Sequence, residues 1–122
     1  MAAMEPPKLF EAEYKFACLV WDHEPINSTD LVRLSREQLG WKKSTTYTVL
    51  RKLCSRGILK NENATVTALV KKADVQQYES RAVVDKTFDG SLPQFLTAFL
   101  GGKKLTRQEA EALKRIIEEA AE

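Results

Sequence analysis

The sequence has few of the residues that build metal centres or disulfide frameworks. Its 122 residues include two cysteines, Cys18 and Cys54, and one histidine, His23. A structural zinc site takes about four Cys or His ligands, and no CxxC pair occurs here. We therefore expect no metal, no cofactor and no disulfide, and we expect both thiols to be buried by the apolar residues around them.

Catalytic signatures are missing as well. The chain has five glycines, none of them in a Gly-rich phosphate loop, and neither GxSxG nor HExxH occurs. Asp22, His23 and Glu24 form a small polar cluster, but they stand at the predicted end of a helix, where such side chains cap and solvate the terminus. The sequence predicts that the protein is not an enzyme.

Long apolar runs are also absent. No segment approaches the ~20 apolar residues of a membrane span, and the first eight residues are polar and proline-containing, unlike a signal peptide. We expect a soluble, cytoplasmic protein. Hydrophobic residues make up 43% of the chain, which is enough for a core, and the length suits one compact domain or a small domain with an appendage.

Apolar residues recur at helical spacing through the first half of the chain. This spacing predicts a helix over residues 8–23, a strand-like bridge at residues 26–27 and a second helix that Ser28 caps. A third helix is predicted over residues 44–56, with Ser44 as its N-cap.

The following segment is rich in β-branched residues. Residues 58–60 and 65–70 flank a polar tip at residues 61–63. This composition and spacing predict a β-hairpin.

Helical spacing returns after Lys72. Asp74 is expected to cap a fourth helix, which Asp89 and Gly90 interrupt, and Ser91 to cap a short fifth helix. The T-x-x-E sequence from Thr106 is a capping box that opens a sixth helix, which runs to the end of the chain.

The order of these elements indicates the fold. A helix, a bridge, two helices and a hairpin form the order of a winged helix-turn-helix, whose third helix faces DNA beside the hairpin wing. We therefore predict a mainly α fold with a small β-wing. The winged-helix domain would cover residues 8–72, and a helical region residues 73–122.

Basic residues concentrate on the third predicted helix and its two ends. Residues 42–60 carry +6 in 19 residues with no acidic residue, although the whole chain carries only +2 and the remainder therefore carries −4. Such a concentration is typical of an element that neutralises DNA phosphates. The alternative is a solvated amphipathic helix, or a winged helix that binds a protein partner instead of DNA.

Helical geometry divides these residues into two roles. The apolar Val49, Leu50 and Leu53 face inward, so that polar residues at the start of the helix face outward, where recognition helices reach base edges. The predicted base-reading residues are Thr45, Thr46, Tyr47, Thr48, Arg51 and Lys52. The predicted phosphate contacts are Lys42, Lys43, Ser44, Arg56, Lys60 and Asn63.

Several motifs together resemble the penicillinase and methicillin-resistance repressor family. They are Leu9-x-x-Ala12-Glu13-Tyr14, Leu19-Val20-Trp21, the stretch Gly40-Trp41-x-x-Ser44-Thr45-Thr46-Tyr47-Thr48-x-Leu50-x-x-Leu53-x-x-x-Gly57, then Phe88-Asp89-Gly90-Ser91, and Leu105-Thr106-x-x-Glu109. The resemblance covers residues 9–119. It implies a homodimeric transcriptional repressor that binds a palindromic operator and controls genes of the β-lactam-resistance type.

The resemblance also implies that the last three helices form the dimer. These helices have more apolar positions than three short helices can bury alone, and a second copy would cover them. The alternative is that they pack on the DNA-binding core. The predicted dimerisation residues are Phe88, Leu92, Phe95, Leu96, Phe99, Leu113, Ile116 and Ile117.

Two further family properties are tested by this sequence. Family repressors are inactivated when a membrane sensor-protease cuts an Asn-Phe bond in the short helix, and the matching pair here is Ala98-Phe99, which lacks the asparagine. A copper-responsive branch carries a C-terminal cysteine cluster, which this chain does not have. The polar hairpin tip has no aromatic residue, so we expect weak wing contact through Lys60 and Asn63.

Overall fold

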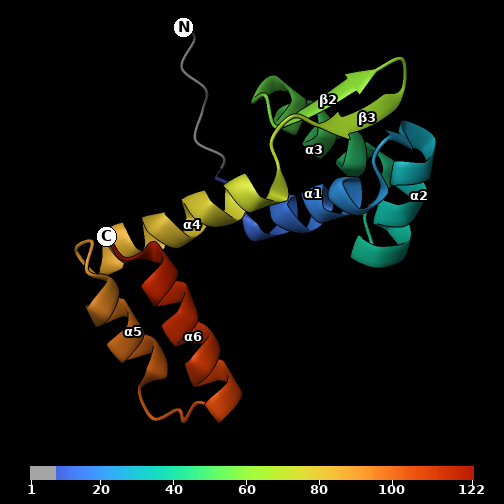
Figure 1. Ribbon diagram of the computed structural model, residues 1–122. Helices are drawn as coiled ribbons and strands as arrows, with labels where there is room; N and C mark the ends of the chain where they lie inside the picture. The colour runs from blue at the N-terminus through green and yellow to red at the C-terminus, as the bar shows by residue number, and fades with distance from the viewer. Residues whose placement is uncertain (1–7) are drawn as a thin grey trace, which may run out of the picture. The chain divides into compact units, whose positions relative to one another are not determined.

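The computed structural model describes residues 8–122 (Figure 1). It is mainly helical with one small sheet, which confirms the predicted fold class. The elements in chain order are α1 Glu11–His23, β1 Ile26–Asn27, α2 Ser28–Leu39, α3 Lys43–Ser55, β2 Leu59–Glu62, β3 Thr65–Ala68, α4 Lys72–Thr87, α5 Leu92–Leu100 and α6 Arg107–Ala120.

The chain forms two compact units, and the boundary along the chain falls between Val83 and Val84, within α4. The sequence places the boundary earlier, after residue 72. The first turns of α4 belong to the first unit because Val75 is fully buried in its core.

The core of the first unit joins three helices to the sheet. Phe16 of α1, Leu31 of α2, Leu50 and Leu53 of α3 and Val66 of β3 are all 1% exposed or less. Helix α1 contacts α2 and β3, while α3 contacts α2 and β2. This packing buries one side of α3 and leaves its other side to solvent.

The three strands are antiparallel in the order β1-β3-β2, and they confirm the predicted bridge and hairpin. Ile26 pairs with Val66, and Glu62 pairs with Thr65. Only Asn63 and Ala64 lie between the hairpin strands, with φ values of 52° and 63°. Positive φ at both central residues is the conformation of a type I′ turn.

Several helix starts differ from the predictions. Asn27 caps α2, because its Oδ1 accepts from the Thr29 amide at 2.8 Å, and Ser28 is the first helical residue. Helix α3 begins at Lys43 without a side-chain cap, so Ser44 lies inside it. Asp74 lies in the first turn of α4, which starts at Lys72.

The capping predictions for the second unit are confirmed. The Ser91 hydroxyl accepts from the Gln94 amide at 3.2 Å. Thr106 and Glu109 form the predicted capping box, with hydrogen bonds of 3.0 and 3.1 Å. These signals are local in the sequence, so they do not depend on tertiary packing.

Apolar side chains of the second unit remain exposed. No residue of α5 or α6 is buried, and Phe99 and Ile116 are 59% and 61% exposed. The Phe95 ring packs within the unit against Phe88 and Phe99, with centroid distances of 5.5 and 5.8 Å. Even with these contacts, Leu92, Phe99, Ile116 and Ile117 are each more than half exposed.

The two cysteines form no disulfide with each other. Cys18 and Cys54 are free and half-buried, whereas the sequence analysis predicted fully buried thiols. Within residues 8–122, no cluster of three or more His, Cys, Asp or Glu could hold a metal ion. No helix in the same range has the length and hydropathy of a membrane span.

Candidate nucleic-acid interface

Five predicted site residues lie together at the start of α3. Lys43, Ser44, Tyr47, Thr48 and Arg51 line one depression of the protein surface. Their spacing of three to four residues places them along one face of the helix. We call this set the α3 N-terminal surface; Thr45 is exposed beside it.

Hydrogen bonds fix two side chains of this surface. The Thr48 hydroxyl donates to the Ser44 carbonyl at 2.9 Å, which leaves its methyl group and its oxygen lone pairs available. The half-buried Tyr47 directs its hydroxyl at Ser28 Oγ, 3.4 Å away. These contacts reduce the rotamer freedom that a bound ligand would otherwise have to remove.

Thr46 does not belong to this surface. Its side chain is fully buried, and its hydroxyl donates to the Lys42 carbonyl at 3.3 Å. A buried side chain cannot reach a base, so the sequence-based assignment of Thr46 to base reading is wrong. Its position on the inward face of α3, beside Leu50, explains why.

Two of the basic residues are engaged by an acidic residue of α1. Glu13 is only 5% exposed. Its Oε2 lies 3.0 Å from Lys52 Nζ, and its Oε1 lies 3.6 Å from Arg56 Nη1. Arg56 also donates to the Lys8 carbonyl, which ties the end of α3 to the chain just before α1.

Opposing influences act on the Glu13 carboxyl. Burial alone would raise its pKa, because the charged form loses hydration. The Phe10 amide, which donates to Oε1 at 2.9 Å, and the cations Lys52 and Arg56 favour the charged form more strongly. The pKa of Glu13 is therefore lowered, and the group is a carboxylate at neutral pH.

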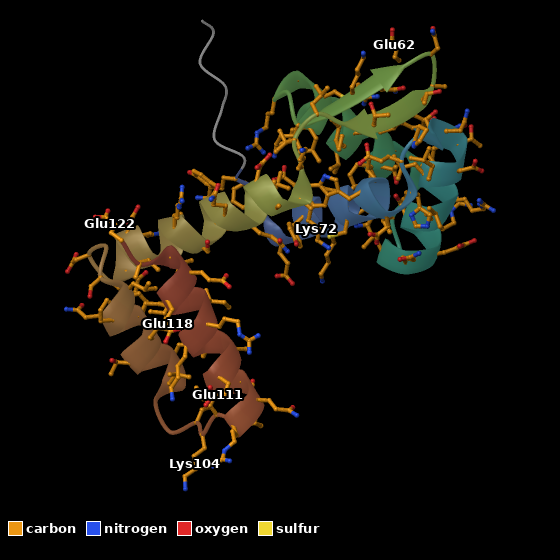
Figure 2. All side chains as sticks on the ribbon, in the orientation of Figure 1. Glu62, Lys72, Lys104, Glu111, Glu118 and Glu122 are labelled. Atoms are coloured by element: carbon orange, nitrogen blue, oxygen red, sulfur yellow. The ribbon has the colours of Figure 1, made fainter. Side chains whose placement is uncertain are left out.

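The wing carries its own ion pair. Lys60 Nζ lies 2.8 Å from Glu62 Oε2, and Figure 2 shows Glu62 at the outer part of the hairpin. This contact raises the pKa of Lys60 and lowers that of Glu62. Asn63 occupies the turn. The wing is therefore close to electrically neutral.

Fewer basic residues are therefore exposed without an ion pair than the charge count of the sequence indicates. Lys42, Lys43 and Arg51 are exposed and form no ion pair within residues 8–122, while Lys52, Arg56 and Lys60 are each paired. The spacing of Lys60 and Glu62 on one strand face could have indicated their pair. Glu13 lies far from Lys52 in the sequence, so no local signal predicted that contact.

The chain matches a known protein family over most of its length. The penicillinase repressor family model matches residues 9–119. The chain belongs to the penicillinase repressor family. This confirms the resemblance found in the sequence, and it makes the chain a member of a family of regulators and not an enzyme.

Relatives of the chain are distant but similar in length. The penicillinase repressor of Bacillus licheniformis is 23% identical over 117 residues, which span 93% of this chain and 91% of the relative. An uncharacterized 16.5 kDa protein of Latilactobacillus sakei is 23% identical over 110 residues, 87% of this chain and 75% of the relative.

Solved structures of the repressor BlaI share the fold of the first unit. The solution structure of its DNA-binding domain has a TM-score of 0.52 and 24% identity, over 59% of this chain and 93% of that domain. Monomeric Bacillus licheniformis BlaI in complex with the blaP half-operator has a TM-score of 0.51 and 23% identity, over 57% and 90% of the two chains. These matches establish a winged-helix fold.

Proposed function

We propose that this penicillinase-repressor-family protein is a cytoplasmic, sequence-specific DNA-binding repressor that reads its operator with the start of α3. The observation that carries the proposal is the α3 N-terminal surface, where Lys43 and Arg51 flank Ser44, Tyr47 and Thr48 in one surface depression. Cations interleaved with hydroxyl groups suit a surface that must bind phosphates and base edges together.

The proposed roles follow from position. Lys42, Lys43 and Ser44, at the first turn of α3, would contact phosphates, which attract a helix N-terminus. Thr45, Tyr47, Thr48 and Arg51 would contact bases. A threonine methyl suits a thymine methyl, and an arginine can donate two hydrogen bonds to guanine.

The remaining predicted residues take smaller roles in this proposal. Lys52 and Arg56 are directed at Glu13, so they would act mainly by holding α3 in place. Lys60 is paired with Glu62, and Asn63 lies in the wing turn, so wing contacts with phosphates would be weak.

We further propose that the repressor is a homodimer on a palindromic operator. The exposed apolar side chains of α5 and α6, Ile116, Ile117, Leu92 and Phe99 among them, support this, because a second copy would remove them from water. A two-fold dimer places two α3 helices on two half-sites. The BlaI structure with a half-operator supports a half-site as the unit of binding.

The regulated genes and the route of induction are proposed by family membership alone. They would be genes of the β-lactam-resistance type, released when a membrane sensor-protease cuts the repressor. The matching bond, Ala98–Phe99, lies within helix α5, and both side chains are exposed. A protease needs an extended substrate, so cleavage there would require α5 to unwind locally.

The decisive experiment is sedimentation of the purified chain with and without palindromic duplexes. We expect a species of about twice the 13.8 kDa chain mass that binds one duplex and releases it as salt rises from about 50 to 200 mM. A protein that ignores DNA at low salt would contradict the proposal, and it would favour a winged helix that binds a protein partner.

A further inference from the structure

We propose that Glu13 is a specificity-determining residue of the repressor: its carboxylate holds the Lys52 ammonium on α1 and thereby limits binding to DNA of any sequence. The inference rests on the proposed DNA-binding function. Glu13 itself lies on α1 and would act through Lys52, so it is a positioning residue and not a DNA contact.

The contacts of Glu13 cross from one helix to another. The carboxylate joins α1 to α3, with Lys52 Nζ at 3.0 Å and Arg56 Nη1 at 3.6 Å. The Phe10 ring, also at the start of α1, lies 5.7 Å from Lys52 Nζ. A cation over an aromatic face is attracted to it, so two groups of α1 hold the same ammonium.

A capping role alone does not account for this arrangement. Glu13 does cap α1, since its Oε1 accepts from the Phe10 amide. Glu109 performs the same task for α6 from an exposed position, and it forms no ion pair with another helix in the part of the chain that the structure describes. Burial of a carboxylate removes it from water, which is unfavourable unless cations compensate. The ion pairs with Lys52 and Arg56, and not the capping of α1, therefore account for the burial of the Glu13 carboxylate.

Lys52 lies where its ammonium could otherwise bind DNA. It follows Thr48 of the α3 N-terminal surface by four residues, which is one helical turn. Its side chain is 54% exposed. The long, flexible stem of a lysine allows its ammonium to reach different partners, so Glu13 and a nearby phosphate would compete for it.

The competition has a definite effect on selectivity. A lysine on a phosphate adds affinity that does not depend on sequence, and each such contact steepens the dependence of log K on log salt by about 0.9. If Glu13 retains Lys52, the repressor lacks this contribution on every duplex. Discrimination then depends on the base-reading residues of the α3 N-terminal surface.

The test compares Glu13→Gln with wild type in titrations of operator and scrambled duplexes over a range of salt concentrations. Glutamine retains an oxygen that accepts from the Phe10 amide, so the cap survives while the charge is lost. We expect scrambled-duplex affinity to rise roughly three- to tenfold per protomer at about 100 mM salt, with a salt slope steeper by about 1 per protomer. The operator-to-scrambled ratio should fall.

Two matched variants make the result specific. Glu11→Gln removes the same charge from the same helix, but among residues 8–122 Glu11 pairs only with the exposed Lys15, at 3.3 Å, so we expect a much smaller change. The double variant Glu13→Gln/Lys52→Gln should return the salt slope to its wild-type value, because the released ammonium is gone.

A second comparison does not require Glu13→Gln to fold. Lys52→Gln should reduce the salt slope by less than half as much as Lys43→Gln does, since Lys43 forms no ion pair within residues 8–122. Equal reductions would overturn the inference, as would equal effects of Glu13→Gln and Glu11→Gln. In both cases the wild-type protein still binds DNA, and the proposed function stands. A wild-type protein that binds no duplex overturns both.

Discussion

Thr48 and Arg51 lie almost one helical turn apart on the α3 N-terminal surface, and both are exposed. We predict that Thr48→Ala and Arg51→Ala each reduce the preference for operator over scrambled duplex, by roughly 1–3 kcal/mol for a bidentate arginine contact and less for threonine. Binding titrations with both duplexes measure this preference.

The control for these two residues is Lys43→Ala. A phosphate contact carries no sequence information, so this variant should weaken binding equally on both duplexes. If Thr48→Ala and Arg51→Ala also weaken both duplexes equally, their assignment to base reading is wrong.

The Glu13 carboxylate should make the stability of the first unit depend on pH. Burial raises its pKa, but the Phe10 amide, Lys52 and Arg56 outweigh burial, so the folded pKa lies below the unfolded value of about 4.3. The unfolded chain then binds the proton more readily. The stabilisation is present above about pH 4.3 and is lost as pH falls through the folded pKa.

This predicts that Glu13→Gln lowers the free energy of unfolding near pH 7 and that the difference from wild type shrinks below about pH 4. Chemical denaturation of both proteins across this range measures it. A difference that stays constant down to pH 3 would show that packing, and not the ion pairs, accounts for the loss.

At the scale of elements, the wing turn is strained at one position. Ala64 has a φ of 63°, in the left-handed region that disfavours residues with a Cβ atom. Asn-Gly is the preferred sequence for a type I′ turn. We predict that Ala64→Gly stabilises the first unit by about 1 kcal/mol, measured as a higher denaturation midpoint. The β-branched Ala64→Val should lower the midpoint, and the opposite order would contradict this account of the turn.

The elements themselves were largely predictable from the sequence. The hairpin, the bridge and the caps at Ser91 and Thr106 each depend on residues a few positions apart, so local patterns revealed them. The starts of α2 and α3 were misplaced by one residue because Asn27 and Ser28 are both good caps, and because α3 starts without a capping side chain.

Contacts between elements were harder to predict from the sequence than the elements themselves. Thr46 was assigned to DNA because polar residues crowd the start of α3, although it precedes Leu50 and Leu53 by four and seven residues, a spacing that places it on the inward face that the core buries. Glu13 stands in an ordinary first-turn position, and nothing near it in the sequence indicates its pairing with Lys52 and Arg56. Charge counted along the sequence therefore overestimates the charge available to a ligand.

At the scale of the whole molecule, the two units differ in what they leave exposed. The first unit holds all the buried hydrophobic residues among residues 8–122, although Phe10, Leu69 and Val83 are exposed, and it presents cations and hydroxyl groups on α3. The second unit buries no residue of α5 or α6 and presents isoleucine, leucine and phenylalanine side chains. This contrast suits a chain that binds DNA with one unit and a second copy with the other.

The dimer is therefore the last property to test, and α6 offers a matched pair of variants. Ile116 is 61% exposed in one chain, and a glutamate there would place an unpaired charge in the proposed interface. We predict that Ile116→Glu sediments as a monomer and binds a palindromic operator at least tenfold more weakly, because linked half-sites no longer add their affinities, while a single half-site duplex binds as before. Gln108→Glu adds the same charge at an exposed polar position of α6 and should remain dimeric. A dimer that survives Ile116→Glu would mean that these apolar side chains serve another contact.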